Sequence, residues 1–334
     1  MKSPSNIRRT TLLGALSAVA LPAGLMPRRA NAAEFPGSQP IKIVVPATAG
    51  GSADIVARLI SNHMASQLKT PIVVDNVSGA GGTVGAARVA RAAADGHTLM
   101  LGFTSNVETA PMLVRNLPYD PIRDFAPVGR AVTVSLCVVA TPELQVANMK
   151  ELIALAKSRA GTAPVMYGAW GNGSAAHLTM EGINLPTKAG MKMIPYKSEA
   201  DVQRALLGNE VLVGPQTVGL LLPHLRSGKF KALGIAAKKR SVLLPDVPTL
   251  AEQGIPFDLS AWLGLFAPAG TSEPVLDSLA GAMQFALRQP DVVERMRAIG
   301  MEVDTISRQE FVAAIPKEIA IWRQLIQSAG VQAE

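Results

Sequence analysis

Cysteine is almost absent from this chain of 334 residues, and Cys137 is the only one. A single cysteine excludes a disulfide bond within the chain. Cys137 lies inside the apolar run Val134–Val139, which predicts a buried thiol in a β-strand rather than a nucleophile.

Histidine is also scarce, and its four copies are scattered along the chain. None has a Cys, His or carboxylate partner at the spacing of a metal site, so we expect no metal. His177 falls in the first turn of an expected helix, where it either donates to a cleft or packs beneath it. The other three are His63, His97 and His224.

The familiar catalytic and nucleotide-binding motifs are missing. Ser174 precedes His177 by three residues, but no Gly-x-Ser-x-Gly elbow surrounds it. Paired carboxylates do not stand at the turns, which argues against a glycosidase. Gly79–Gly85 follows a strand and precedes a helix, yet Val84 replaces the third glycine of a dinucleotide motif. A phosphate loop of the lysine-serine type is absent as well. We therefore expect no cofactor, and these motifs give no support for an enzyme.

The first 33 residues have the pattern of an export signal that is removed from the mature protein. A basic head that contains Arg8 and Arg9 precedes the apolar stretch Thr11–Leu25. That stretch is shorter than the roughly 20 residues of a membrane-spanning helix. Ala30-Asn31-Ala32 resembles a cleavage site, and no cysteine follows it that would carry a lipid anchor. We expect a soluble periplasmic protein, exported by the Sec or the twin-arginine route.

Removing this segment removes most of the excess positive charge. The whole chain has 32 basic and 25 acidic residues, a net charge of +7. Five of the basic residues and none of the acidic ones lie in the first 33 positions, which leaves 27 against 25, a net charge of +2. The basic balance is therefore no evidence for nucleic-acid binding.

Strand-like and helix-like patterns alternate from residue 41 to the C-terminus, which predicts an α/β fold with two largely parallel sheets flanked by helices. The expected strands lie at 41–47, 71–76, 98–103, 132–140, 165–169, 191–195, 211–214, 230–236, 262–268 and 301–304. The expected helices lie at 55–68, 83–94, 149–158, 175–185, 200–207, 218–226, 273–287, 292–299 and 310–328. A short helix is also expected after Thr104-Ser105-Asn106, which would cap it.

Two of these strands, at 132–140 and 262–268, are expected to cross between two lobes. The first lobe would hold residues 34–134 and 262–334, and the second would hold residues 135–261. A ligand would bind in the cleft between the lobes, where strand ends meet helix N-termini. The turns expected to line it are 48–52, 78–83, 104–106, 170–174, 196–198 and 215–217.

The first of these turns follows the strand Ile41–Val45 and contains Gly50-Gly51. A helix begins directly after it, so the turn offers free N–H groups and the positive end of a helix dipole. This geometry suits a phosphate or a carboxylate. Taken alone, however, the stretch is more typical of an ordinary strand-to-helix connection.

Many short segments of the mature chain stand in a recognisable order: Pro40–Pro46, Ala49–Asp54, Ala57-Arg58, Val74–Asn76, Gly79–Gly82, Asp95–Leu99, Leu117–Pro121, Asp124–Val128, Gly173–Leu178, Pro195–Lys197, Leu244–Glu252 and Trp262–Pro268. In these segments the chain resembles the Bug-type solute-binding receptors of tripartite tricarboxylate transporters. That family is a branch of the two-lobed, type II periplasmic binding proteins. The resemblance implies a monomeric, non-catalytic receptor that captures a small organic acid and delivers it to membrane permease subunits.

The resemblance also implies that two loops hold the ligand carboxylate through backbone amides, hydroxyls and water. By position these loops are Pro46–Asp54 and Gly171–His177. Asp54 is interpreted as a first-turn residue that favours the helix dipole, and Arg58 as structural. The residues expected to line the binding site are Ala47, Thr48, Ala49, Gly50, Gly51, Ser52, Asp54, Gly81, Thr104, Ser105, Trp170, Gly173, Ser174, His177, Tyr196, Gln216 and Thr217.

Three positions depart from the family pattern. Ser198 stands where a glycine is common after Tyr196-Lys197, and Trp170 stands where a small residue is common, so Trp170 either narrows the pocket or lies on the lobe surface. Gln216 stands where the family often has an acidic residue. A neutral amide there gives a ligand ammonium no charge partner, which favours a dicarboxylate or another carboxylate without an amino group.

The expected mechanism is closure of the lobes about the crossing strands, after which the closed form docks with the permease. A receptor that presents its ligand to a membrane kinase would use the same closed state. An exported hydrolase would instead need a base near Ser174.

Overall fold

The structure is a computed structural model that describes residues 35–196, 198–304 and 306–333. The predicted export signal lies outside the described residues, as does Lys197. The fold described below is that of the unit Phe35–Glu334.

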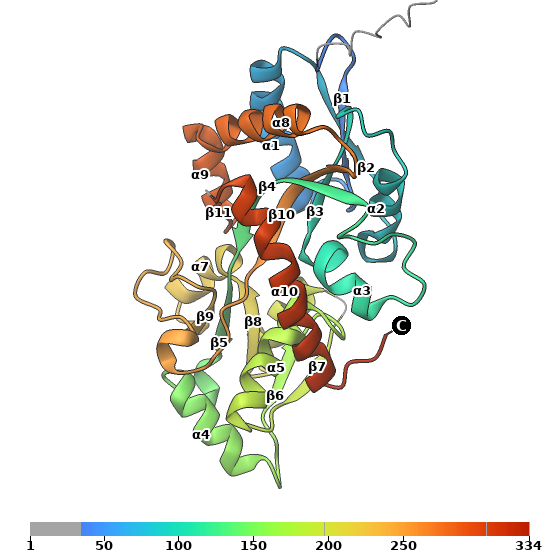
Figure 1. Ribbon diagram of the computed structural model, residues 1–334. Helices are drawn as coiled ribbons and strands as arrows, with labels where there is room; N and C mark the ends of the chain where they lie inside the picture. The colour runs from blue at the N-terminus through green and yellow to red at the C-terminus, as the bar shows by residue number, and fades with distance from the viewer. Residues whose placement is uncertain (1–34, 197, 305, 334) are drawn as a thin grey trace, which may run out of the picture. The chain divides into compact units, whose positions relative to one another are not determined.

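The described strands form two sheets (Figure 1). The first has six strands in the order β11-β4-β10-β3-β1-β2, and the second has five in the order β7-β6-β8-β5-β9. The strands are β1 (Ile41–Val45), β2 (Ile72–Asn76), β3 (Thr98–Phe103), β4 (Phe125–Val134), β5 (Leu136–Ala140), β6 (Met166–Ala169), β7 (Lys192–Pro195), β8 (Val213–Thr217), β9 (Lys231–Ala236), β10 (Ala261–Pro268) and β11 (Glu302–Val303).

Helices cover both faces of each sheet. The α-helices are α1 (Ser52–Leu68), α2 (Thr83–Ala90), α3 (Ala110–Leu113), α4 (Met149–Arg159), α5 (Ala175–Thr187), α6 (Glu199–Leu207), α7 (Val218–Arg226), α8 (Glu273–Leu287), α9 (Pro290–Ala298) and α10 (Arg308–Ser328). Short helical turns lie at η1 (Ala80–Gly82), η2 (Ser105–Thr109, a π-helical turn), η3 (Pro142–Leu144) and η4 (Ala251–Gln253). On the first sheet, α1, α8 and α9 pack on one face, and α2 and the first half of α10 pack on the other. On the second sheet, α4 and α5 cover one face and α6 and α7 the other.

The expected α/β class with two lobes is confirmed, and the sheets prove to be mixed. Strands β1, β2 and β3 pair in parallel, and β6 pairs in parallel with β7 and β8. The strands next to the connections between the sheets run antiparallel to their neighbours: β10 against β3 and β4, and β5 against β8 and β9. Periodicity reveals strands but not their direction, so the sequence could not distinguish the two cases.

Three local expectations are wrong. The single strand expected at 132–140 is two strands, β4 and β5, which belong to different sheets and are separated only by Ser135. The start of this strand is also wrong, because β4 begins at Phe125, seven residues before the expected start at 132. The turn expected at 215–217 is the end of β8, where Gln216 pairs with Cys137 of β5.

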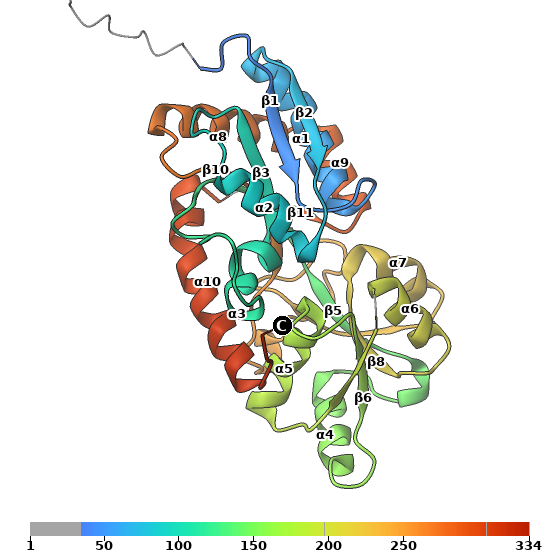
Figure 2. The ribbon, with the colours of Figure 1, turned by 90° about the vertical axis from the view of Figure 1, so that its right-hand side faces the viewer.

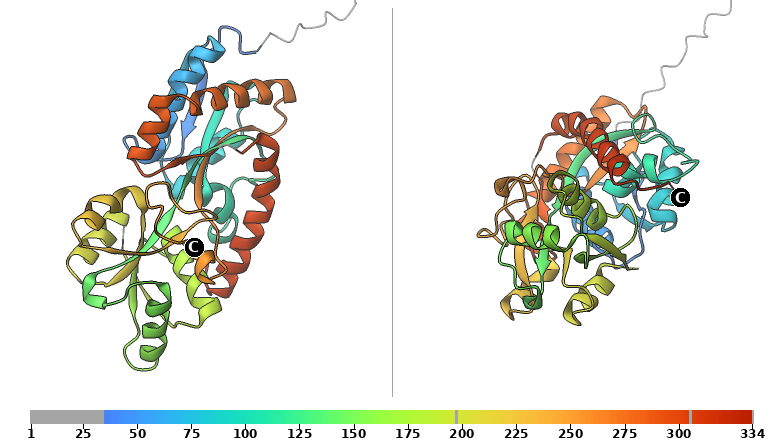
Figure 3. Two further views of the ribbon diagram at one scale, coloured as in Figure 1. Left: turned by 90° about the vertical axis from the view of Figure 1, so that its left-hand side faces the viewer. Right: turned by 90° about the horizontal axis from the view of Figure 1, so that it is seen from below.

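Helix α10 packs against both halves of the unit (Figure 1, Figure 3). Phe311, Ile315 and Ile319 belong to the apolar cluster on the first sheet. Trp322 and Ile326, one and two turns further on, belong to the cluster on the second sheet. The helix therefore contributes a third connection, besides the two chain crossings. Of the helices that the structure describes, none is both long and apolar enough to cross a membrane.

Candidate functional site

A cavity of about 850 Å³ opens where the strand ends of the two sheets approach each other. Figure 2 shows α6 and α7 at the end of the second sheet that faces the first sheet. Eleven of the residues expected at the site line this cavity: Ala47, Thr48, Gly51, Ser52, Gly81, Thr104, Ser105, Trp170, Gly173, Ser174 and Thr217.

One wall is the turn between β1 and α1. Gly51 is the N-cap of α1, and no side chain caps the helix. The amides of Ser52 and Ala53 have no acceptor within the helix, because first-turn amides lack one. Asp54 does not line the cavity. It is buried, it accepts from the amide of Gly50 at 2.9 Å and it pairs with Arg58 at 3.0 Å. These contacts hold the pKa of the Asp54 carboxyl below its usual range. Through the same contacts Asp54 stabilises the turn.

The opposite wall is the turn between β6 and α5. Ser174 caps α5 by accepting from the amide of His177 at 3.2 Å. The His177 ring turns back, and its Nδ1 accepts from the amide of Gly173 at 3.0 Å. Burial lowers the pKa of His177, which favours the neutral ring that this acceptor role requires. Of the two interpretations of His177, packing beneath the loop is the one the structure supports.

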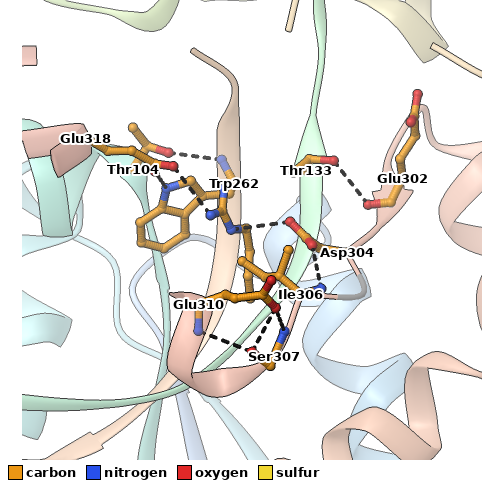
Figure 4. Close-up of polar contacts among 10 residues, drawn as sticks. Thr104, Thr133, Trp262, Glu302, Asp304, Ile306, Ser307, Glu310 and Glu318 are labelled. Carbon is orange, nitrogen blue, oxygen red and sulfur yellow. Dashed lines mark hydrogen bonds and ion pairs between the residues drawn. The ribbon is translucent and has the colours of Figure 1, made fainter. Parts of the chain in front are cut away.

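Thr104 does not act as the expected helix cap. Its φ and ψ are helical, and its side chain makes no capping bond to η2. Its Oγ1 instead accepts from the amide of Trp262 at 2.9 Å, which ties the end of β3 to the start of β10 (Figure 4).

The remaining expected residues lie off the cavity wall. Ala49 and Gly50 are exposed at the tip of the first turn. Gln216 is fully buried, and its Nε2 donates to the carbonyl of Pro215. Tyr196 lines a separate shallow pocket with Asp201 and Arg204.

Glu199 is a cavity residue that the sequence analysis missed. It is the first residue of α6, and its carboxylate accepts from the amide and the hydroxyl of Thr217, with Oγ1 and Oε2 3.1 Å apart. Burial raises its pKa, which the bonds from Thr217 partly offset. The sequence did offer one signal for this role, because Glu199 directly follows Ser198 in the turn after a strand. The expected helix begins at position 200, one residue later than α6.

All three tryptophans of the chain line the cavity: Trp170, Trp262 and Trp322. Trp170 was expected, whereas Trp262 and Trp322 were missed at this site because they reach it from β10 and α10. Among the described residues that line the cavity, none is Lys, Arg or His. Across the described part of the chain, no group of three or more Cys, His, Asp or Glu residues is placed to hold a metal ion.

Two of these tryptophans donate hydrogen bonds from their indole N–H groups to buried carboxylates. The Trp262 Nε1 donates to Glu318 at 3.2 Å (Figure 4), and the Trp322 Nε1 donates to Glu108 at 2.8 Å. Arg130 pairs with Glu318 at 3.4 Å and with Asp304 at 3.2 Å. Burial, reinforced by the nearby Glu318 charge, raises the pKa of Glu108 well above its usual value of 4.5.

We expect Glu108→Gln to stabilise the protein at neutral pH. An acid whose pKa is raised by folding binds its proton more tightly in the folded state. The unfolding free energy therefore falls as pH rises from about 4.5 toward the raised pKa. Glutamine keeps an acceptor for Trp322 but does not titrate, so the variant should lack this fall and gain about 1 kcal/mol or more at pH 7.

Urea unfolding of both proteins between pH 4 and pH 8 tests this expectation. Glu143→Gln, at an exposed position, is the matched control and should leave the pH profile unchanged. Parallel profiles for Glu108→Gln and the wild type would show that Glu108 does not titrate as described.

The two halves also touch at the rim of the cavity. A Cβ atom on Gly219, at the start of α7, would lie 2.4 Å from the Cα of Gly300, which follows α9. A Cβ atom on Gly173 would lie 2.7 Å from a methyl group of Leu113 in α3. Contacts between the two halves therefore flank the cavity on two sides.

Comparison with known proteins agrees with this architecture. Residues 56–331 match the model of the tripartite tricarboxylate transporter family receptor. Protein BugT of Bordetella pertussis is 35% identical over 301 residues, which cover 88% of this chain and 90% of BugT.

Two solved structures are similar over their whole length. MatC (Rpa3494) from Rhodopseudomonas palustris with bound malate is 34% identical with a TM-score of 0.70, and the match covers 87% of this chain and 100% of MatC. Rpa4515 of R. palustris with adipate is 30% identical with a TM-score of 0.75, covering 90% of this chain and 100% of Rpa4515. With a family model that matches most of its length, the chain belongs to the receptor family of the tripartite tricarboxylate transporters.

Proposed function

We propose that this protein is a periplasmic, non-catalytic receptor that binds a small carboxylate in the cavity and delivers it to a tripartite-type membrane permease. One observation carries the proposal: the N-termini of α1 and α5, from opposite walls, open into one cavity whose described lining has no basic side chain.

Helix N-termini suit an anion in such a cavity. Each carries the equivalent of about half a positive charge, and its first amides need an acceptor. The amides of Ser52 and Ala53 on one side and of Ala175 on the other supply donors. Water bridges between these donors and a carboxylate would be nearly as favourable as direct bonds.

The rest of the wall favours a ligand with an apolar body. Phe103, Val134, Leu178 and Trp322 line the space between the polar turns. Apolar lining with a few fixed polar groups is typical of small-molecule sites. The relatives support the same ligand class, because MatC was solved with malate and Rpa4515 with adipate, which are both small organic acids.

The contacts of Ser174 argue against a hydrolase. Its Oγ is used as a helix cap, and the ring of His177 accepts from Gly173, an arrangement that gives Ser174 no base.

The proposed mechanism is closure of two lobes, residues 34–134 with 262–334 and residues 135–261. The assignment follows the two sheets, which the chain joins at Ser135 and between β9 and β10. The second half of α10 packs on the second sheet, so closure would have to bend or slide this helix contact.

We expect Gly51→Val to weaken carboxylate binding by about 10-fold or more without unfolding the protein. Gly51 has φ −77° and ψ 171°, a conformation open to any residue, and a Cβ atom there would lie 3.4 Å from the carbonyl oxygen of Thr48. The added side chain would crowd the anion-binding turn, and a misplaced donor loses most of its bond.

A thermal-shift screen against mono-, di- and tricarboxylates, followed by calorimetry on the best ligand, tests the function. Gly161→Val is the control, because Gly161 is exposed and a Cβ atom there would meet nothing within 4 Å. If no carboxylate shifts the wild type, the proposed function is refuted. Equal affinity of the Gly51 variant would refute the site.

A further inference from the structure

We propose that Glu199 and Trp170 form a subsite for a cationic nitrogen, so that the ligand is a carboxylate that also carries an ammonium group. This inference rests on the proposed function and adds the second recognition element of the ligand. Its basis is that Glu199 and Trp170 both line the cavity, Glu199 from α6 and Trp170 from the turn that packs against the cluster of α6 and α7.

The charge of the cavity wall is the first argument. Among the described residues that line it, Glu199 is the sole charged side chain. The anion-binding groups at α1 and α5 are partial charges, whereas Glu199 can bear a full negative charge. In a partly desolvated cavity, an unpaired carboxylate is costly and a ligand cation beside it is strongly favoured.

The hydrogen bonds of Glu199 supply the second argument. Thr217 is the N-cap of α7, and its amide and hydroxyl both donate to Glu199. The protein's own carboxylate thus occupies the place at this helix start that a second ligand carboxylate would need. Each carboxylate oxygen still has a free lone pair that an ammonium N–H can use.

Trp170 supplies the third argument. It lines the same cavity and packs against the apolar cluster that contains Val202 of α6 and Val218 of α7. An indole face attracts cations, and more so where water is partly excluded. A carboxylate and an indole that line the same cavity can together bind a cation.

These contacts argue against an expectation based on the sequence. The neutral Gln216 suggested a ligand without an amino group, because no acid stood on that loop. In the structure Gln216 is buried in β8, and the acidic group in the cavity comes from the neighbouring α6 instead.

The test uses three sets of straight-chain probes of equal length that differ only at the far end from one carboxylate. They are 4-aminobutyrate, butyrate and succinate; 5-aminovalerate, valerate and glutarate; and 6-aminohexanoate, hexanoate and adipate. Calorimetry on the wild type should rank the ammonium-ended probe tightest and the dicarboxylate weakest in at least one set.

Glu199→Gln removes the charge but keeps the shape of the side chain: its Oε1 can still accept from the Thr217 amide, and its Nε2 can donate to the Thr217 hydroxyl. We expect it to reduce the ratio of affinities for the ammonium-ended and dicarboxylate probes by about 30-fold or more. Glu210→Gln is the matched control, because Glu210 is exposed, follows the same helix and does not line the cavity. It should leave the ratio unchanged.

The outcomes separate the two proposals. If carboxylates bind but the wild type prefers dicarboxylates in every set, or if Glu199→Gln leaves the ratio unchanged, the cation subsite is overturned and the receptor function stands. If none of the nine probes binds, the cation subsite is overturned for these ligands, and the wider carboxylate screen decides the receptor function. The wild-type ranking needs no variant, so poor folding of Glu199→Gln could not hide the result.

Discussion

Gly219→Ala is expected to weaken ligand binding about 10- to 100-fold while the protein stays folded. A Cβ atom at Gly219 would lie 2.4 Å from the Cα of Gly300 and 2.5 Å from its amide nitrogen. Both neighbours are backbone atoms, which cannot rotate away as a side chain would. We expect the two halves to relieve this clash by moving apart at the rim of the cavity.

The fold itself should tolerate the change. Gly219 belongs to helix α7, where alanine is the better helix former by up to about 1 kcal/mol. The cost of the methyl group therefore falls on the contact between the two halves at Gly219 and Gly300 and not on α7. A variant that is as stable as the wild type without ligand, yet binds weakly, is the expected signature.

Gly281→Ala is the matched control for this experiment. Gly281 also lies inside a helix, α8, but a Cβ atom there would meet nothing within 4 Å. Calorimetry with the ligand found in the screen, and small-angle scattering with and without it, compare the two variants. Ligand should make the wild type and Gly281→Ala more compact, and Gly219→Ala less so. Equal affinity and equal compaction would refute closure through the Gly219–Gly300 contact.

The sequence predicted the elements well where their signals are local. The strand Ile41–Val45 and the helix after it follow from a β-branched run, two glycines and an apolar period. The burial of Cys137 follows from its apolar neighbours, and it is confirmed by an exposed fraction of 0%. Such features depend on residues within one element.

The candidate site was predictable only in part, because half of its wall is set by long-range contacts. Turns after strands β1 and β6 carry Gly51 and Ser174, and they reach the cavity as expected. Trp322 reaches the cavity because α10 packs against both halves. No local sequence pattern predicts such packing. Gln216 was expected at the site but is buried, because pairing with the antiparallel strand β5 continues along β8 to residue 217.

Arg130→Met is expected to lower the unfolding free energy by about 3–5 kcal/mol. Arg130 is 9% exposed, and its guanidinium pairs with Asp304 and Glu318, whose side chains are 11% and 9% exposed. Methionine would fill much of the same volume and stay against the Phe311 ring, which lies 5.3 Å from the guanidinium carbon. The loss of stability would therefore come from two buried carboxylates that have lost their cation, and not from an empty space left by the arginine side chain.

A double variant separates this cause from lost packing. Adding Glu318→Gln to Arg130→Met removes one of the uncompensated charges and keeps an acceptor for the Trp262 indole. The double variant should be more stable than Arg130→Met alone by about 1 kcal/mol or more, a coupling typical of residues in one network. If packing were the cause, the second substitution would lower stability further.

Urea unfolding at pH 7 measures the whole set, with Arg123→Met as the control. Arg123 pairs with Asp124 at 2.9 Å, but its side chain is 76% exposed, so its loss should leave the unfolding free energy nearly unchanged. A loss below 1 kcal/mol for Arg130→Met would contradict the role of the pair. Because Trp262 lines the cavity and bonds to Glu318, the same network that stabilises the fold also fixes one wall of the binding site.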